Sequence, residues 1–224
     1  MKGKLIVLEG LDGSGKATQT KFLFDRCCQK RIPVTKVSFP NYDSNSSALV
    51  KMYLRGQMGK VDEVNAYAAS TFYSVDRYAT YNSLYKDQHE QGTHIIADRY
   101  TTSNIVHQAP KLPAEERAGY IQWLEDLEYT KMGLPRPDMV IYLDMDPSVS
   151  RHLLDKRYMG NSDKLDIHEA DFEYLMHCRK AALKAAEYCG WTVISCCDEN
   201  GLLGTDQISD MIWDKVKTLF ESAE

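Results

Sequence analysis

Short apolar runs alternate with longer stretches of helix-forming residues along the 224 residues of this chain. Apolar runs of about four to eight residues, bounded by glycine, proline or asparagine, are typical of buried strands. Five such runs predict strands at 4–9, 34–39, 93–97, 138–143 and 191–196. The segments between them predict helices at 17–30, 46–54, 62–91, 113–131, 147–157, 167–188 and 207–220. Strands separated by helices indicate an α/β fold with a parallel sheet covered on both faces.

The longest predicted helix, 62–91, carries a largely apolar stripe at three- and four-residue steps. The stripe consists of Val64, Ala68, Phe72, Val75, Ala79 and Asn82. A stripe with this spacing is typical of a helix face that packs on the core. We therefore expect Phe72 to be a core residue. Tyr73 and Arg77, one helical turn apart, would share a different face.

Composition excludes several classes of protein. Hydrophobic residues make up 43% of the chain, and the length suits one domain spanning 1–224. No apolar run approaches the roughly 20 residues that cross a membrane, and the stretch after Met1 is too short for a signal peptide. The net charge of −5 argues against a protein that coats nucleic acid. The six cysteines lack a zinc-site spacing, so we expect reduced thiols in a cytoplasmic protein without a membrane or nucleic-acid partner.

A glycine-rich segment follows the first predicted strand. Residues 10–16 match the phosphate-binding pattern G-x-x-x-x-G-K, between a predicted strand and a predicted helix. The glycines let successive backbone N–H groups converge on a phosphate, and the helix N-terminus adds positive partial charge. We expect Lys16, on an exposed loop, to reach the transferring phosphates. The predicted triphosphate-binding residues are Gly10, Leu11, Asp12, Gly13, Ser14, Gly15, Lys16, Ala17 and Thr18.

One position departs from the phosphate-binding pattern. The pattern has serine or threonine after the lysine as a ligand of Mg²⁺, but this chain has Ala17 followed by Thr18. Mg²⁺ commonly uses one or two carboxylates together with phosphate oxygens and waters. We therefore expect Mg²⁺ to be held with the help of Thr18 or of a carboxylate, Asp12 or Asp98.

A second group of polar residues follows the third predicted strand. Ligands of open parallel sheets bind at the carboxyl ends of the strands, where Asp98, Arg99 and Tyr100 lie. Asp98 could bind Mg²⁺ or one of its waters, and Arg99 could hold a second phosphate. The alternative is a structural Asp–Arg pair that caps the next helix. The location favours the functional interpretation.

Several short motifs, in this order and spacing, resemble those of thymidylate kinases over nearly the whole chain. They are Leu8-Glu9-Gly10 with the glycine-rich segment, Phe39-Pro40, Tyr73 through Arg77, Asp98-Arg99-Tyr100 with Ser103, Asn104 and Gln108, Pro137-Asp138, and Asp166-Ile167-His168-Glu169. The resemblance implies a P-loop NTPase three-layer sandwich, whose five-stranded parallel sheet has helices on both faces. It also implies transfer of the γ-phosphoryl group of ATP to dTMP with Mg²⁺, small-molecule nucleotides as partners, and a homodimer.

The resemblance also implies an acceptor site. In thymidylate kinases an aromatic ring stacks on the base and an arginine four residues later binds it, which is the step from Tyr73 to Arg77. Phe72 would take the place of Tyr73 if the helix were irregular by one residue. The substrate-binding residues implied in this way are Phe39, Tyr73, Arg77, Arg99, Ser103, Asn104 and Gln108.

Two positions near the implied acceptor site invite alternatives. His107 aligns with an aromatic residue near the sugar 2′ position, where it would exclude a ribose hydroxyl, or it is a surface residue of its helix. Tyr42 stands where the family usually has an arginine that contacts the acceptor phosphate. That departure leaves Arg99 and Arg77 as the cations of this site.

A lid is implied for the catalytic step. Some thymidylate kinases place an arginine inside the phosphate loop, where this chain has Gly13, so it resembles the group that supplies basic residues from a lid. The polar segment around 151–166 offers Lys156, Arg157 and Lys164, of which Arg157 is the first candidate; a solvated charge cluster is the alternative. The predicted catalytic residues are Lys16, Arg99, Arg157 and Asp12.

Two other functions stay open at this point. A related kinase could act on another nucleotide or on a deoxynucleoside, because burial of one methyl group contributes only about 0.8 kcal/mol. A nucleotide-dependent switch is the other class, and a GTPase would carry a guanine-recognition motif of the N-K-x-D type late in the chain. Residues 198–200, D-E-N, do not match that motif.

Overall fold

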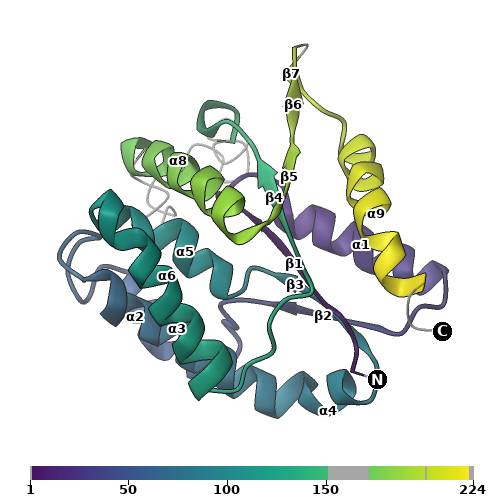
Figure 1. Cartoon of the computed structure of the whole chain (residues 1–224), viewed down its shortest axis with the longest axis horizontal. Helices are drawn as coiled ribbons and strands as arrows, with labels where there is room; N and C mark the ends of the chain where they lie inside the picture. The colour runs from purple at the N-terminus through teal and green to yellow at the C-terminus, as the bar shows by residue number, and fades with distance from the viewer. Residues whose placement is uncertain (1, 151–171, 200, 222–224) are drawn as a thin grey trace.

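Five parallel strands form the centre of the computed structural model, which describes residues 2–150, 172–199 and 201–221 (Figure 1). Each pair of neighbouring strands in the sheet is parallel. The predicted strands and the parallel sheet are therefore confirmed. In the order found across the sheet, the strands are β2 (Val34–Ser38), β3 (His94–Asp98), β1 (Leu5–Gly10), β4 (Met139–Asp144) and β5 (Thr192–Ser195).

Helices cover both faces of this sheet, as expected (Figure 1). On one face lie α1 (Lys16–Gln29) and α9 (Thr205–Glu221), which contact each other. The other face carries most of the remaining helices, and the site described below lies among them. These helices are α2 (Ala48–Leu54), α3 (Ala66–Thr80), α4 (Lys86–Glu90), α5 (Thr101–Gln108), α6 (Arg117–Glu125) and α8 (Phe172–Cys189).

Shorter elements connect the helices and strands. Two segments, η2 and η5, continue α3 and α6 with the wider turn of a π-helix. A two-stranded antiparallel hairpin follows β5. Among the described residues, no helix combines the length and the apolar character that crossing a membrane requires. The bounds are η1 (Asn45–Ser47), η2 (Tyr81–Tyr85), η3 (Ala109–Lys111), η4 (Ala114–Glu116), η5 (Asp126–Lys131), β6 (Cys197–Asp198) and β7 (Gly201–Leu202).

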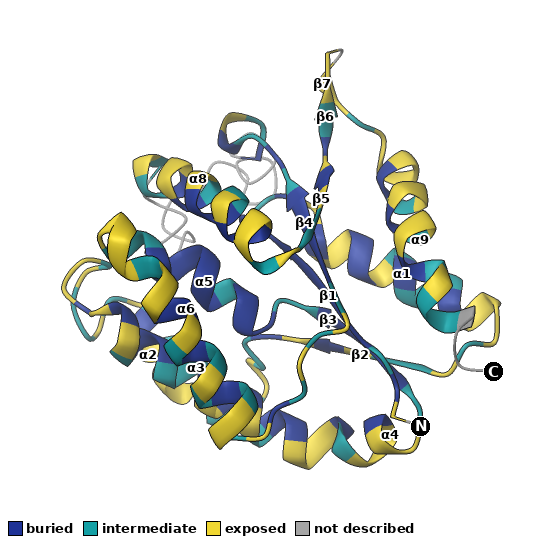
Figure 2. Cartoon of the chain, viewed as in Figure 1, coloured by how far each residue is buried: buried dark blue, intermediate teal, exposed yellow. Residues whose placement is uncertain are grey.

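The central strand β1 is buried along its whole length, as the dark blue ribbon in Figure 2 shows. Ile6 and Leu8 pack in the core beneath α1 and α9, whereas Leu5 and Val7 pack in a separate core on the other face. Successive side chains of a strand point to opposite faces, so a strand covered on both sides needs apolar residues at every position. This requirement explains the continuous apolar run in the sequence.

The helix predicted over 62–91 differs from the observed one in continuity and in its buried face. α3 passes into the π-helical segment η2 and then into α4. Val75 is 45% exposed, and Phe72 and Ala79 are only half-buried. Val64 is buried, and Ala68 and Phe72 pack against its core cluster, so the expectation that the stripe faces the core is confirmed at this end. It is wrong at Val75, and Phe72 is partly rather than fully buried.

Polar side chains share the buried face of α3 with Ala66 and Ala69. Ser70, Ser74 and Arg77 are each no more than 1% exposed. They hydrogen bond to Tyr120 and Glu128, which compensates the loss of water. A search for apolar periodicity cannot detect a face of this kind, because its burial depends on partners far away in the sequence.

Candidate active site

The phosphate loop connects the carboxyl end of β1 to the N-terminus of α1. Gly15, the residue before the helix, has φ = 83°, in the left-handed region that glycine adopts without strain. A Cβ added to Gly10 would lie 2.7 Å from Ser14 Oγ and 2.9 Å from the carbonyl oxygen of Leu143. The glycines of the motif therefore allow a tight loop packed against the end of β4.

Two features of the loop suit a bound phosphate. Ser14 is 2% exposed, and its hydroxyl oxygen has no hydrogen-bond partner among the described residues. A buried hydroxyl without a partner costs roughly 1–3 kcal/mol, which a phosphate oxygen would recover. The N-terminus of α1 points its free backbone N–H groups at the same place. The loop thus fits the triphosphate expected from the sequence.

Lys16 is the first residue of α1 and is only 6% exposed. The expectation that it stands on an exposed loop is wrong, because the loop folds over its side chain. Its Nζ donates a 2.6 Å hydrogen bond to the carbonyl oxygen of Leu11 and lies 3.9 Å from Asp12 Oδ1. Burial and the neighbouring charge of Arg99 lower the pKa of Lys16. An anionic group placed beside this ammonium would stabilise it.

Arg99 lies between the phosphate loop and a cavity. It follows β3 with φ = 70°, a left-handed conformation that is uncommon for arginine. Its Nη2 donates a hydrogen bond to Asp12 Oδ1, and its Nη1 lies 3.6 Å from Glu9 Oε1 and 3.2 Å from His107 Nε2. Burial alone would lower the pKa of Arg99, but Asp12 and Glu9 raise it above its ordinary value. The guanidinium is therefore a fixed positive charge.

Glu9 is a buried carboxylate that our sequence analysis did not single out. It is 0% exposed and accepts hydrogen bonds from Thr102 Oγ1 at 2.8 Å, Ser103 Oγ at 2.7 Å and its neighbour's backbone N–H at 3.0 Å. These bonds attach the start of α5 to the end of β1. An acidic residue inside an otherwise apolar strand is the sequence signal that could have identified it.

A cavity opens beside Arg99, between α3 and α5. All seven residues expected to bind the acceptor line it, and Asp12 of the phosphate loop reaches its wall. The seven residues are Phe39, Tyr73, Arg77, Arg99, Ser103, Asn104 and Gln108. Tertiary folding thus brings together residues from three separate parts of the chain next to the phosphate loop.

The two aromatic candidates on α3 occupy different environments. Tyr73 lines the cavity and Phe72 does not, although the ring centroid of each lies 6.3 Å from that of Tyr53. A one-residue irregularity in the helix would have put Phe72 in the place of Tyr73. The helix is regular at these residues, because the π-helical segment begins only at Tyr81. Of the two rings, Tyr73 is therefore the one that lines the cavity.

His107 and Tyr42 also line this cavity. His107 is 6% exposed, so the alternative that it is a surface residue of its helix is wrong. Tyr42 is 52% exposed at the rim, where the resemblance would have placed an arginine. Among the described cavity residues, Arg77 and Arg99 supply the guanidinium groups.

A buried carboxylate, that of Glu128, is paired with one of the two cavity arginines. Glu128, in the π-helical segment η5, is 0% exposed and forms an ion pair with Arg77. Our sequence analysis also passed over Glu128. Its position in a polar-looking stretch of helix gives no local sign that it is buried.

The carboxylates expected to hold Mg²⁺ lie at the edge of the sheet. Asp12 Oδ1 lies 3.9 Å from Lys16 Nζ, and Asp98 is the last residue of β3, the strand that pairs with β1. Thr18 is exposed on the first turn of α1. The described residues contain no cluster of three or more His, Cys, Asp or Glu side chains arranged as a metal site. In a Mg²⁺ site the protein commonly supplies one or two carboxylates, and phosphate oxygens complete the coordination.

The predicted lid, around 151–166, lies outside the described residues, and so do its basic candidates Lys156, Arg157 and Lys164. The described chain before it is anchored firmly. Arg179 of α8 donates hydrogen bonds of 2.7 and 3.1 Å to Asp144 and of 2.7 Å to Asp146. These ion pairs attach the end of β4 to α8.

The chain is similar to proteins of known function. The family model for thymidylate kinase matches residues 8–200. A thymidylate kinase of Caenorhabditis elegans is 31% identical over 158 residues, covering 66% of each chain. One from Schizosaccharomyces pombe is 32% identical over 149 residues, covering 66% of this chain and 64% of the relative. These alignments span slightly less than two thirds of the relatives' lengths.

One solved structure shows the same fold. The structure of a thymidylate kinase from Candida albicans matches with a TM-score of 0.69. The match covers 97% of this chain and 92% of that chain, at 21% sequence identity. The P-loop α/β fold expected from the sequence is therefore confirmed.

Proposed function

This chain belongs to the thymidylate kinase family, and we propose that it transfers the γ-phosphoryl group of ATP to dTMP, giving dTDP and ADP. The observation that supports this proposal most directly is the hydrogen bond between Arg99 and Asp12. Through it, the loop that would hold the donor triphosphate directly adjoins the cavity that would hold the acceptor. Phosphoryl transfer needs this adjacency, because the two reacting oxygens must lie in line on either side of phosphorus.

On the donor side, the backbone N–H groups of the loop and the ammonium of Lys16 would bind the phosphates of ATP. Asp12 and Asp98 are the carboxylates that would hold Mg²⁺, which when bound supplies further neutralisation of the phosphate charge. Arg99 would stabilise the negative charge that spreads over the transferring group. Fixed charges in a buried site act strongly, since they need no reorganisation during the reaction. No general base is needed, because the acceptor phosphate is ionised near pH 7.

On the acceptor side, the cavity offers a complementary set of groups to a pyrimidine. Tyr73 would stack on the base, an interaction worth about 1–3 kcal/mol. Gln108 is 1% exposed, and its carbonyl oxygen has no hydrogen-bond partner among the described residues. That oxygen would accept a hydrogen bond from a ring N–H of the base. Phe39, Ser103 and Asn104 would complete the walls, and His107 would lie beside the sugar.

We further infer a single catalytic domain over 1–224, with a lid around 151–166 and Arg157 as its first catalytic candidate, in a cytoplasmic homodimer. The apolar stripe of α3 supports the homodimer. Val75 is 45% exposed, and Leu49 and Met52 of the neighbouring α2 are 40% and 41% exposed. Exposed apolar side chains on two helices in contact are consistent with a subunit interface.

A substrate panel tests the proposed activity. Purified protein is incubated with ATP and Mg²⁺ together with dTMP, dUMP, UMP, CMP or AMP, and the diphosphate formed is measured. We expect dTDP to form fastest, and ATP hydrolysis without an acceptor to be slow. Phosphorylation of another monophosphate in preference to dTMP would assign this site to a related kinase. ATP hydrolysis independent of any acceptor would indicate a nucleotide-dependent switch.

A further inference from the structure

The carboxylate of Glu128 is the most heavily hydrogen-bonded acidic group beside the cavity. Its Oε1 accepts hydrogen bonds from Ser74 Oγ at 2.6 Å and from Arg77 Nη2 at 2.5 Å. Its Oε2 accepts from Arg77 Nε at 2.8 Å and from Thr101 Oγ1 at 2.5 Å. The donors come from α3 and α5, while Glu128 itself lies on η5. One buried carboxylate therefore joins three segments around the cavity.

The backbone at Glu128 is itself unusual. η5 is a π-helical segment at the end of α6, and the N–H of Met132 bonds to the carbonyl of Leu127, five residues earlier. Such wide turns are rare, and they occur frequently at functional sites. The extra residue in the turn changes which side chains of the helix face inward. Here the residue that faces inward is a charged one.

Arg77 is held by these contacts in a single orientation. The bidentate pair with Glu128 uses its Nε–H and one N–H of Nη2, and a third N–H, on Nη1, bonds to the carbonyl of Tyr100 at 3.3 Å. Arginine carries five N–H donors. Two of them, one on Nη1 and one on Nη2, consequently have no partner within the described part of the chain.

Those two donors belong to a side chain that is 1% exposed but lines the cavity. Buried N–H groups normally find an acceptor, and an acceptor group bound in the cavity would provide one. Burial alone would lower the pKa of Arg77, but the charge and hydrogen bonds of Glu128 raise it above its ordinary value. The side chain of Arg77 therefore stays positively charged. Its nitrogen atoms can donate hydrogen bonds but cannot accept them.

We propose that Glu128 is a positioning residue, which fixes Arg77 so that its free N–H groups face the acceptor base and require a carbonyl oxygen there. This inference rests on the proposed kinase activity and adds Glu128, which does not line the cavity, to the residues on which binding of the acceptor base depends. Cytosine presents an exocyclic amino group at the corresponding ring position. The N–H groups of that amino group would face the N–H groups of Arg77, so neither would have a hydrogen-bond acceptor. Unpaired donors of this kind are strongly disfavoured in a buried site.

A purely structural role for Glu128 is the competing explanation, since a buried ion pair that joins three segments could serve the fold alone. The two roles differ in what they change. A structural defect would lower the melting temperature and affect the use of both substrates. A positioning defect would affect the acceptor, and it would affect the choice between oxo- and amino-pyrimidines.

The test compares Glu128→Gln with a matched control, Glu125→Gln. Glu125 lies three residues earlier on the same helix and forms a 3.0 Å ion pair with Arg136, in which the two side chains are 33% and 57% exposed. The purified full-length variants are assayed for kcat and for the KM of dTMP, ATP and dCMP. For Glu128→Gln we expect the KM of dTMP to rise about tenfold or more, with the KM of ATP within about twofold of wild type. We also expect the preference for dTMP over dCMP to narrow, and Glu125→Gln to match wild type.

Thr101→Val provides a milder variant if Glu128→Gln does not fold. It removes one of the four hydrogen bonds to the carboxylate and leaves the Arg77 pair intact. We expect a rise of a few fold in the KM of dTMP with the KM of ATP unchanged, together with a somewhat lower melting temperature because the buried carboxylate loses one donor.

The outcomes separate the inference from the activity on which it rests. An unchanged dTMP-to-dCMP preference in Glu128→Gln, or equal rises in the KM of dTMP and ATP, would overturn the positioning role alone. Wild-type protein that fails to phosphorylate dTMP would overturn the proposed function and this inference together.

Discussion

Arg99, at the carboxyl end of β3, donates a hydrogen bond to Asp12 in the phosphate loop. The two residues are separated by 87 positions in the sequence, yet the parallel pairing of β1 with β3 brings their strand ends together. The bond leaves the arginine 16% exposed toward the cavity. In the proposed reaction, this guanidinium would lie between the donor phosphates and the acceptor phosphate.

Arg99→Ala should lower kcat about a hundredfold or more, with a much smaller effect on the KM of ATP. The reason is that a fixed charge beside the transferring group stabilises the transition state more than the bound substrates. Steady-state kinetics with varied ATP and dTMP would measure this. Arg136→Ala, at an arginine that is 57% exposed and outside the cavity, is the control and should leave kcat unchanged. Normal kinetics for Arg99→Ala would show that the acceptor phosphate binds elsewhere.

Lys16→Ala should abolish turnover without loss of the fold. Because burial lowers the pKa of Lys16, the folded state is a poor environment for its charge in the absence of a phosphate. Removal of the ammonium should therefore not lower the melting temperature. ATP should raise the melting temperature of wild type but not of Lys16→Ala. Lys21→Ala, whose side chain is 63% exposed on the same helix, should behave as wild type in both assays.

Tyr73→Ala and Phe72→Ala should separate base stacking from packing. Loss of about 1–3 kcal/mol of stacking predicts that Tyr73→Ala raises the Kd of dTMP roughly 5- to 150-fold. Phe72 is outside the cavity wall, so its replacement should leave the Kd within about twofold. Calorimetric titration with dTMP would measure both. A larger effect from Phe72→Ala would mean that the wrong ring was assigned to the base.

Val75→Glu should dissociate the proposed homodimer. A charge in the middle of an apolar interface cannot be desolvated cheaply without a partner. Light scattering after size exclusion should give about twice the chain mass of 25.6 kDa for wild type and the single chain mass for the variant. Tyr188→Glu, at a 57% exposed position on α8, should remain a dimer. A monomeric wild-type protein would exclude the dimer directly.

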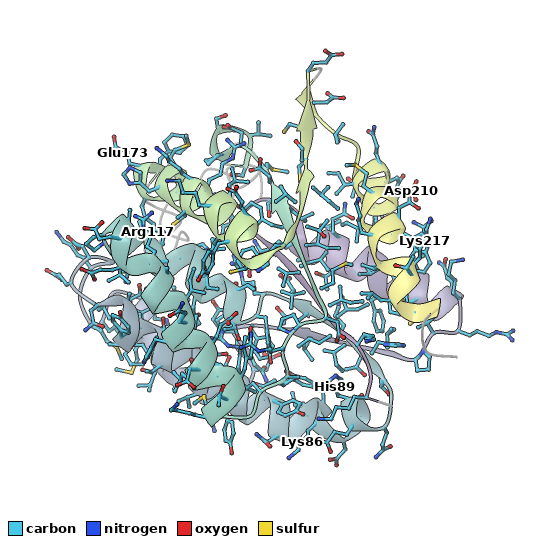
Figure 3. All side chains as sticks on the ribbon, viewed as in Figure 1. Lys86, His89, Arg117, Glu173, Asp210 and Lys217 are labelled. Carbon is cyan, nitrogen blue, oxygen red and sulfur yellow. The ribbon has the colours of Figure 1, made fainter. Side chains whose placement is uncertain are left out.

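The unfolding free energy should fall as the pH decreases through about 6.5. His89 on α4 (Figure 3) and His94 on β3 are 3% and 7% exposed, and burial lowers the pKa of each, with a further lowering by Lys2 and Lys4 respectively. A lowered folded pKa means that the unfolded chain binds protons first, so stability is present above the unfolded pKa and is lost as the pH falls below it.

Urea unfolding at pH 7.5 and pH 5.5 would measure this loss. The Nδ1 of His94 accepts a 2.9 Å hydrogen bond from the backbone N–H of Lys4, and protonation of that nitrogen would break it. His94→Gln should therefore show a smaller difference between the two pH values. His177→Gln, at an exposed position on α8, should retain the wild-type difference. An identical pH dependence in His94→Gln would contradict this explanation.

Local patterns in the sequence were sufficient for the sheet and the phosphate loop. β1 begins with four consecutive apolar residues, Leu5 to Leu8, and the glycines at 10, 13 and 15 imply a particular backbone, so both features are visible within a few residues. Helix α5 was not among the helices predicted from the apolar pattern. Its buried side chains include Thr101, Thr102 and Asn104, whose polarity hides the helix from that analysis.

The sequence by itself determined where phosphate would bind, because a glycine-rich turn between a strand and a helix creates its N–H cradle locally. Only the tertiary structure decided which face of α3 is buried and which carboxylates hold the arginines in place. Glu9 and Glu128 acquire their roles from Arg99 and Arg77, residues 90 and 51 positions away. Burial of a charge depends on the partner that compensates it, and that partner becomes a neighbour only when the chain folds.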